Sequence, residues 1–209
     1  MAQQRYGRGV LDYKMNVCLL NSHSSNNRNV FELSERNHRY YCERHNYDML
    51  NMIKPYNRCI DFDLLKYLLL YYDVVAIKGS DLLFTDFDKK LTDFQLGDIT
   101  GALEASGNNV INGDFTIWKR SALYLIPTLQ QTQQQWGDYQ ATLNACRQFV
   151  MIQPLQHAAG SLNPSIANNC WHPGDYSIHF HAIGYAPINS VKADAMQSFI
   201  QDHPELDKQ

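Results

Sequence analysis

Short apolar runs and longer amphipathic segments alternate through the first half of the chain. Residues 15–20, 47–53 and 74–77 are apolar enough to predict three buried strands. The segments between them, 27–45 and 61–72, repeat apolar residues at helical spacing and predict two helices. A strand–helix–strand–helix–strand order is typical of parallel strands joined by right-handed crossovers. The pattern therefore predicts an α/β fold with a mostly parallel central sheet flanked by helices.

The pattern is less regular after residue 86, where a long polar loop is expected at 153–173. Predicted strands cover 99–103, 115–118, 150–152 and 176–183, and predicted helices cover 121–135, 137–147 and 191–200. The pattern shows no repeats and no linker. We therefore expect one domain over residues 1–209, with flexible ends at 1–14 and 202–209.

The apolar run at 74–77 ends abruptly in Gly79-Ser80-Asp81. A buried parallel strand that ends this way places a carboxylate at the carboxyl edge of the sheet, where open α/β folds bind their ligands. Gly79 and Ser80 let the backbone approach a ligand closely. A carboxylate here suits Mg²⁺ or Mn²⁺, which bind oxygen ligands and bridge diphosphates. The alternative is that Asp81 only caps the turn that follows.

A second candidate site lies in the predicted strand that carries His179 and His181. Side chains alternate along a strand, so these two imidazoles point to the same face. An imidazole beside a carboxylate suits Mn²⁺ better than Mg²⁺. The alternative is a pair of core histidines satisfied by hydrogen bonds. Together with Asp81, the histidines suggest a divalent ion that holds a phosphate-bearing substrate.

Two polar segments in the middle of the chain each allow a structural and a functional interpretation. Asn112-Gly113-Asp114 is typical of a turn, yet Asn112 and a flexible glycine can also receive a sugar hydroxyl or an incoming acceptor. Asp138 begins a predicted helix and can act as its N-cap. Its functional alternative is a carboxylate beside a reacting carbon, serving as a base or stabilising a cation.

The overall composition narrows the class of protein. Hydrophobic residues make up 44% and charged residues 19%, as in folded globular proteins. A net charge of −3 gives no general attraction to nucleic acid or acidic membranes. Arginine, lysine and tyrosine gather locally at 22–60. A solvated helix face explains this segment most simply, and contact with phosphate or a polynucleotide is the alternative.

The cysteines and the apolar runs predict the cellular compartment. Five scattered cysteines without a C-x-x-C pair favour reduced thiols in an intracellular protein. Residues 1–14 lack the apolar core of a signal peptide. The apolar stretch 64–77 is interrupted by Lys66 and Asp73 and is far short of a membrane span. We therefore expect a cytoplasmic chain without a membrane partner.

Several short motifs follow one another in a fixed order. An apolar strand and loop at 17–22 and a tyrosine-rich stretch at 37–48 are followed by Gly79-Ser80-Asp81, Asn112-Gly113, Asp138-Tyr139-Gln140, Trp171 with Gly174-Asp175, and His179-Phe180. Taken in this order, over residues 15–187, they resemble the small nucleotide-sugar glycosyltransferases of the GT-A fold. The galactosyl-, xylosyl- and mannosyltransferase group is most similar, and the glycogenin-like group is a more distant match.

This resemblance implies a role for each matching position. Contacts to a nucleotide-sugar donor are implied for Asn21, Ser22, Asp48, Lys66, Ser80, Gly113 and Gly184. Binding of Mn²⁺ or Mg²⁺ is implied for Asp81, His179 and His181. A part in catalysis is implied for Asp138, Asn112 and Gln140. The metal would neutralise the charge that develops on the diphosphate leaving group.

Two positions depart from the family pattern. Gly79 stands where the first acid of the D-x-D motif is expected, which removes one charge from the metal or ribose contact. Tyr139 is inserted between Asp138 and Gln140, so these two cannot both match the family's D-Q helix start. The departures allow three outcomes: weak metal dependence, a metal held by Asp81 and the two histidines, or loss of activity.

The function implied is that of a metal-dependent hexosyltransferase, which moves a sugar from a nucleoside-diphosphate sugar to an acceptor hydroxyl. The nearest groups retain the anomeric configuration. The acceptor is a glycan, a small molecule or a hydroxymethylated base in DNA. A non-catalytic nucleotide- or glycan-binding module on a degenerate transferase fold is the alternative, favoured by Gly79. A metal hydrolase is disfavoured, because no further acid follows the histidines in an H-x-H-x-D-type cluster.

Overall fold

The computed structural model describes residues 15–23, 28–53, 59–104, 109–159, 171–180 and 188–207. Its strands are β1 (Val17–His23), β2 (Asp48–Ile53), β3 (Val74–Gly79), β4 (Leu82–Phe84), β5 (Ile99–Leu103), β6 (Ile111–Lys119), β7 (Val150–Ile152), β8 (His157–Ala159) and β9 (Ser177–Phe180). Its α-helices are α1 (Arg28–His45), α2 (Phe62–Tyr71), α3 (Ile126–Trp136), α4 (Tyr139–Ala145) and α5 (Ile188–Asp202). Short 3₁₀ helices are η1 (Leu91–Asp93), η2 (Arg120–Leu125), η3 (Arg147–Phe149) and η5 (Pro204–Leu206).

Six strands form the central sheet, in the order β2-β1-β3-β6-β5-β7. β1 pairs in parallel with β2 and β3, and β5 pairs in parallel with β7. Only β6 runs antiparallel to its two neighbours. The expected mostly parallel sheet is therefore confirmed. Because β1 and β3 are parallel, Ser22 and Gly79 lie side by side at their carboxyl ends.

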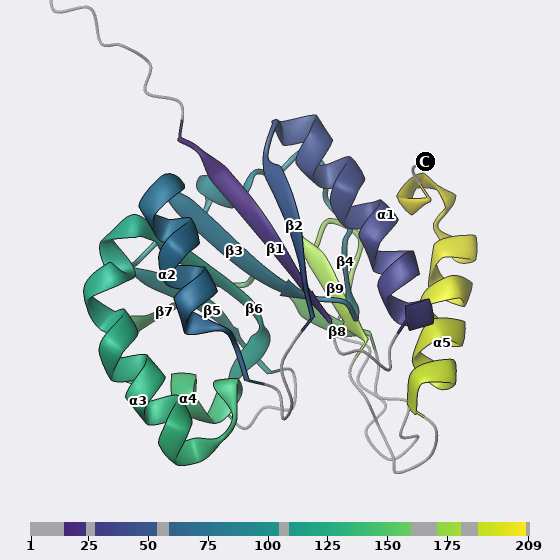
Figure 1. Ribbon diagram of the computed structural model, residues 1–209. Coiled ribbons are helices and arrows are strands. Elements are labelled where there is room, and N and C mark those ends of the chain that lie inside the picture. Colours follow the sequence, from purple (N-terminus) through teal and green to yellow (C-terminus); the bar gives the residue numbers. More distant parts are fainter. Residues whose placement is uncertain are drawn as a thin grey trace, which may run out of the picture.

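Helices cover both faces of this sheet (Figure 1). On one face, α2, α3 and α4 enclose a core around Leu65 and Trp118. On the other face lies α1, whose Tyr41 stacks on Phe84 with ring centroids 3.7 Å apart. α5 packs beside α1 and closes a third core with Met196. The expected flanking helices, and with them the α/β fold class, are confirmed.

The sequence of β3 and of the helix before it explains why this part folds as expected. All six positions of β3 are buried, as in a parallel strand covered on both faces. The carboxylate of Asp61 caps α2: it accepts hydrogen bonds from the backbone N–H of Asp63 at 3.0 Å and of Leu64 at 2.9 Å. The cap fixes the start of α2, and α2 in turn leads into β3.

A second, three-stranded sheet has the order β4-β9-β8. β4 follows β3 after only Ser80 and Asp81, and it pairs antiparallel with β9 so that Leu82 stands opposite His179. β8 pairs with β9 in parallel. The sequence did not predict β4, and β8 lies inside the segment 153–173 that was expected to be a polar loop. Both are three-residue strands, too short to produce a periodic pattern.

The turn expected at Asn112-Gly113-Asp114 is wrong, because β6 runs through all three residues. Polar residues and glycine are typical of turns. Here, however, Asn112 is 1% exposed and makes its hydrogen bonds inside the protein, so it does not need the solvent that a turn provides.

The two ends of the chain differ in how far they are described. The end at 202–209 is described up to Asp207, where Leu206 is buried and Asp207 pairs with Arg36 of α1 at 3.7 Å. Residues 1–14, 208 and 209 lie outside the described residues. In the part of the chain that is described, no helix has both the length and the apolar character needed to cross a bilayer.

Candidate metal centre

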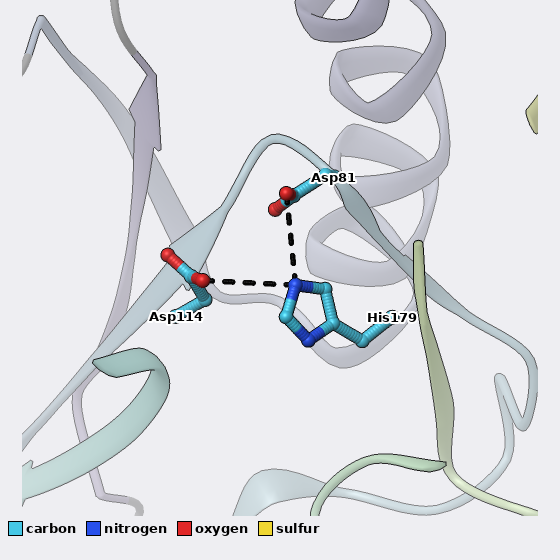
Figure 2. Close-up of side chains that lie close together, drawn as sticks. All are labelled: Asp81, Asp114 and His179. Atoms are coloured by element: carbon cyan, nitrogen blue, oxygen red, sulfur yellow. Dashed lines mark ion pairs between the residues drawn. The ribbon is translucent and has the colours of Figure 1, made fainter. Parts of the chain in front are cut away.

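Asp81, Asp114 and His179 come together at the carboxyl end of β3 (Figure 2). Nε2 of His179 lies 3.6 Å from Oδ2 of Asp81 and 3.6 Å from Oδ2 of Asp114. Ligand atoms that each lie about 2.2 Å from one ion are separated by about 3 to 4.4 Å. The spacing of these three side chains therefore fits a single cation. The imidazole is 3% exposed, whereas the two carboxylates are 15% and 29% exposed, so the acids form the open side of the cluster.

Strand pairing explains how residues so far apart in the sequence meet. Asp81 immediately precedes β4, and its carbonyl accepts a hydrogen bond from the N–H of Phe180 at 2.8 Å, which brings His179 alongside. In the central sheet β3 lies between β1 and β6, and Phe115 of β6 stands opposite Lys78 of β3. This register continues to Asp114, which contacts the end of β3. The connection between β3 and β4 thus supplies Asp81, β6 supplies Asp114 and β9 supplies His179.

Gly79 provides the space that Asp114 occupies. A Cβ atom placed on Gly79 would lie 3.1 Å from Cβ of Asp114, 3.2 Å from its Oδ1 and 3.0 Å from Oδ1 of Asp81. Such contacts are shorter than packed side chains normally tolerate. A side chain at position 79, where the D-x-D pattern has its first acid, would therefore fit only if Asp114 and Asp81 shifted by a few tenths of an ångström. The second carboxylate of the cluster comes from β6 instead of β3.

Asn112 supports both partners of this arrangement. Its Oδ1 accepts a hydrogen bond from the backbone N–H of Asp114 at 2.6 Å, and its Nδ2 lies 3.4 Å from Nδ1 of His179. This contact holds the ring with Nε2 toward Asp81 and Asp114. An amide nitrogen is a donor, so the contact favours the tautomer with its hydrogen on Nε2, whereas a histidine that binds an ion through Nε2 carries its hydrogen on Nδ1. Asn112 is buried behind the cluster, where it contacts Asp114 and His179.

Lys192 of α5 brings a positive charge to the same centre. Its Nζ contacts Oδ2 of Asp81, and its side chain is 9% exposed. Burial alone raises the pKa of the Asp81 carboxyl, but the charges of Lys192 and His179 outweigh burial and hold this pKa well below its usual range. Asp81 is therefore an ionised carboxylate at neutral pH, the form that binds a cation.

The start of α4 packs against β6. Oε1 of Gln140 accepts a hydrogen bond from the N–H of Gly113 at 3.1 Å, and its Nε2 donates to Oε1 of Glu104 at 2.6 Å. Asp138 is the N-cap of α4, and its carboxylate accepts from the backbone N–H of Ala141 at 2.8 Å. Of the two, Gln140 is the one that contacts the strand of the cluster.

Asn21, Ser22 and Ser80 lie at the same carboxyl edge. The N–H of Ser80 donates to the carbonyl of Ser22 at 3.0 Å, and Oγ of Ser22 donates to the carbonyl of Lys78 at 3.3 Å. Nδ2 of Asn21 donates to Oδ1 of Asn51 at 3.3 Å. All three expected donor-binding residues are buried, and the structure brings them next to the strand end that leads to Asp81.

Asp48 and Lys66 do not join this edge. Asp48 is the first residue of β2 and pairs with Cys18, at the amino end of β1. The carboxyl ends of the same strands hold Ser22, so Asp48 lies at the opposite edge of the sheet, and the expected donor contact is corrected. The strand predicted at 47–53 already placed Asp48 at its start, and the donor contact was implied only by the resemblance. Lys66 is exposed on α2, and none of its described contacts reaches the cluster.

Sequence reasoning missed the roles of Asp114 and Lys192. Asp114 directly precedes the strand expected at 115–118, and its place beside Gly79 depends on the pairing of β6 with β3, which no local pattern predicted. Lys192 had no local signal, because its contact joins the C-terminal helix to the connection between β3 and β4. His181 and Gly184, the other expected site residues, lie outside the described residues.

Solved structures with a similar fold are glycosyltransferases. A glycosyltransferase involved in the glycosylation of the major capsid of PBCV-1 is similar at a TM-score of 0.66 and 12% identity, over 88% of this chain and 99% of that chain. The glycosyltransferase GlyE of Streptococcus pneumoniae TIGR4 is similar at a TM-score of 0.53 and 11% identity, over 91% of this chain and 64% of that chain. An active-site mutant of LgtC gives a TM-score of 0.51 and 11% identity, over 89% and 95%.

Neither a family model nor a curated protein matches the sequence. The similarity therefore concerns the fold, and these neighbours all have the GT-A architecture that the order of motifs implied. This chain has the fold of the GT-A glycosyltransferases.

Proposed function

We propose that this protein is a metal-dependent glycosyltransferase that moves a sugar from a nucleoside-diphosphate sugar to an acceptor hydroxyl. The observation that carries the proposal is the cluster of Asp81, Asp114 and His179 at the carboxyl edge of a GT-A sheet. Open α/β sheets bind their ligands at this edge. A diphosphate leaving group needs positive charge there, and two carboxylates with an imidazole are a means of holding it.

The residues of the cluster fit a divalent cation. Asp81 and Asp114 offer oxygen ligands, and His179 offers a nitrogen ligand. Carboxylates suit both Mg²⁺ and Mn²⁺, and the imidazole favours Mn²⁺. When bound, the ion would neutralise the charge that develops on the departing diphosphate. We therefore expect Mn²⁺ as the cofactor, with Mg²⁺ as a weaker substitute.

The remaining residues of this edge position the donor. Asn21, Ser22 and Ser80 lie buried at the strand ends, and we assign them the support of the nucleotide there. Gln140 is held against Gly113, next to the cluster, and we assign it the place beside the sugar. The carboxylate of Asp138 is engaged as a helix cap, so we give it no catalytic part. Retention of the anomeric configuration follows only from the resemblance of the motifs.

The proposed acceptor is a hydroxyl of a glycan or a small molecule. Transfer to a hydroxymethylated base in DNA is the variant that the basic segment at 22–60 suggested. In the described part of that segment, however, the arginines of α1 pair with acids, for example Arg28 with Glu32 and Arg39 with Glu35, each at 2.7 Å. Pairs at this helical spacing are typical of a solvated helix surface. Together with the net charge of −3, they favour the glycan or small molecule.

Ligand binding and donor hydrolysis test the proposal. Thermal unfolding with UDP, GDP and their sugars, with and without Mn²⁺, identifies the donor, because a ligand of the folded state raises the melting temperature. Slow release of the nucleoside diphosphate without acceptor then reports catalysis. Asp81→Asn and Asp114→Asn should abolish the release. Asp88→Asn, which changes an exposed carboxylate paired with Arg44, should leave it unchanged.

The outcomes separate the two candidate functions. Release that survives both Asp81→Asn and Asp114→Asn would overturn the assigned metal centre. Donor binding without any release, in the presence of Mn²⁺ and acceptors, would identify a non-catalytic binding module on the same fold.

A further inference from the structure

Asp81 has a cationic partner that belongs to the protein itself. Nζ of Lys192 contacts the same Oδ2 atom that lies 3.6 Å from Nε2 of His179. The lysine side chain is 9% exposed and that of Asp81 is 15% exposed, so the pair is shielded from water. A salt bridge shielded in this way is much less screened than one on the surface.

The position of Lys192 conflicts with a divalent ion at the cluster. An ammonium group in contact with Asp81 stands within a few ångströms of any cation held by Asp81, Asp114 and His179. Like charges at such a separation repel strongly where water is excluded. The ammonium also uses a lone pair of the carboxylate that the ion needs. Lys192 and the ion therefore oppose each other at Asp81.

The helix that carries Lys192 allows the side chain to move without unfolding the protein. α5 is anchored by Ala193, Met196 and Ile200, which are buried in the core that α5 shares with α1 and β9. Lys192 lies near the start of the helix, on a flexible four-carbon chain that ends in a point charge. A diphosphate bound beside Asp81 would offer this charge a second anionic partner.

We infer that Lys192 occupies Asp81 until the donor binds, so that the divalent ion binds tightly only together with the diphosphate. The inference rests on the proposed function and adds the order in which donor and ion bind. In the donor-free protein, Lys192 takes the place of the missing ion and keeps Asp81 paired. When the donor arrives, its negative charge draws Lys192 away from Asp81 and leaves the carboxylate to the ion. Lys192 is thus a positioning residue for the metal.

Calorimetric titration of Mn²⁺ into the full chain tests the inference, with and without UDP. In the absence of UDP, Lys192→Met should bind Mn²⁺ at least about tenfold more tightly than the wild type, because the opposing charge is gone. UDP should strengthen Mn²⁺ binding much more in the wild type than in Lys192→Met. Lys192→Arg keeps the charge and should bind Mn²⁺ as weakly as the wild type. Lys119→Met is the matched control, since Lys119 ends β6 opposite Val74, at the other edge of the sheet.

Thermal unfolding provides a second readout. Lys192→Met leaves the buried Asp81 carboxylate without its partner, so its melting temperature should fall and Mn²⁺ should restore it. If Lys192→Met fails to fold, titration of the wild type with and without UDP still tests the inference. An Mn²⁺ affinity of the wild type that does not change with UDP would overturn it.

Two further outcomes separate this inference from the proposed function. Equal, measurable Mn²⁺ affinity of the wild type and Lys192→Met overturns the inference alone. Failure of every protein to bind Mn²⁺, even with UDP present, overturns the metal centre and the inference with it.

Discussion

Gly79 and Asp114 share one space at the edge of the sheet, because a Cβ on Gly79 would lie 3.1 Å from Cβ of Asp114 and 3.2 Å from its Oδ1. An acid at position 79 would therefore crowd the acid at position 114, which would have to shift by a few tenths of an ångström. The cluster still has two carboxylates, since β6 delivers the one that β3 lacks. Gly79 alone is thus no sign of a degenerate site.

The crowding between positions 79 and 114 predicts what happens when glycine and aspartate are exchanged between them. Gly79→Asp should crowd Asp114, lower the free energy of unfolding by about 1–3 kcal/mol and weaken Mn²⁺ binding. Asp114→Gly should weaken Mn²⁺ binding by removing a ligand. The double variant Gly79→Asp/Asp114→Gly should regain Mn²⁺ affinity to within about tenfold of the wild type. Calorimetry with Mn²⁺ and UDP measures all four proteins. A double variant weaker than both single variants would contradict the shared space.

The position of Asn112 predicts how the metal affinity depends on the residue behind His179. Asn112→Ala should weaken Mn²⁺ binding by no more than about tenfold, because it removes the hydrogen bond that holds the backbone of Asp114 but also the donor that opposes a hydrogen on Nδ1 of His179. Asn112→Asp can still accept from the N–H of Asp114 and can also accept from Nδ1–H of His179, which leaves Nε2 for the ion. It should bind Mn²⁺ at least as tightly as the wild type. Equal weakening by aspartate and alanine would show that Asn112 does not act through the imidazole.

Replacing Lys78 with methionine should stabilise the protein. Its side chain is fully buried, with Nζ 3.8 Å from the ring centre of Phe84 and 4.6 Å from that of Phe115. Among the described residues, Nζ has no hydrogen-bond partner. Lys78→Met keeps the length of the side chain and removes the buried amine, so the free energy of unfolding near neutral pH should rise by about 1–3 kcal/mol. Chemical denaturation measures it, with Lys119→Met as a half-buried lysine control.

The same lysine predicts a pH dependence. Burial lowers the pKa of Lys78 well below its usual value, although the charge of Asp81 opposes this. Between the lowered folded-state pKa and the unfolded-state value of about 10.4, the unfolded chain binds one more proton. The contribution of Lys78 to stability therefore improves as pH rises through this window, by up to about 1.4 kcal/mol per pH unit. From about pH 8 to about pH 10, the gain shown by Lys78→Met over the wild type should shrink. A constant gain over this range would mean that Lys78 is not the titrating group.

Substitution of Gly113 tests whether donor hydrolysis depends on the contact between α4 and β6. A Cβ on Gly113 would lie 3.1 Å from Cβ of Gln140 and 3.3 Å from its backbone nitrogen. Gly113→Ala should push the start of α4 away from the strand, at a cost of about 1–3 kcal/mol in the free energy of unfolding. Donor hydrolysis should fall, while Mn²⁺ affinity changes little, because the three ligands keep their strands. A loss of Mn²⁺ affinity as large as the loss of hydrolysis would place Gly113 in support of the metal instead.

The sequence by itself indicated the elements of the fold and two of the three members of the cluster, Asp81 and His179. Apolar runs and helical spacing are local properties, so β1, α1, β2, α2 and β3 lie close to their expected positions, and the order of these elements indicates parallel pairing. Asp81 was equally accessible to sequence reasoning, because an acid directly after a buried strand has to lie at the carboxyl edge of the sheet. The pairing of β4 with β9 then determined where His179 stands.

Only the tertiary structure decided that Asp114 and Lys192 also surround Asp81. Asp114 joins the cluster because β6 runs antiparallel to β3 in a particular register, and Lys192 joins it because α5 packs beside α1. The polar segment at 112–114 becomes a strand because its partners, His179 and Gln140, come from other parts of the chain. Register and docking depend on the packing of side chains that are distant in sequence, and no local pattern records which of them will meet.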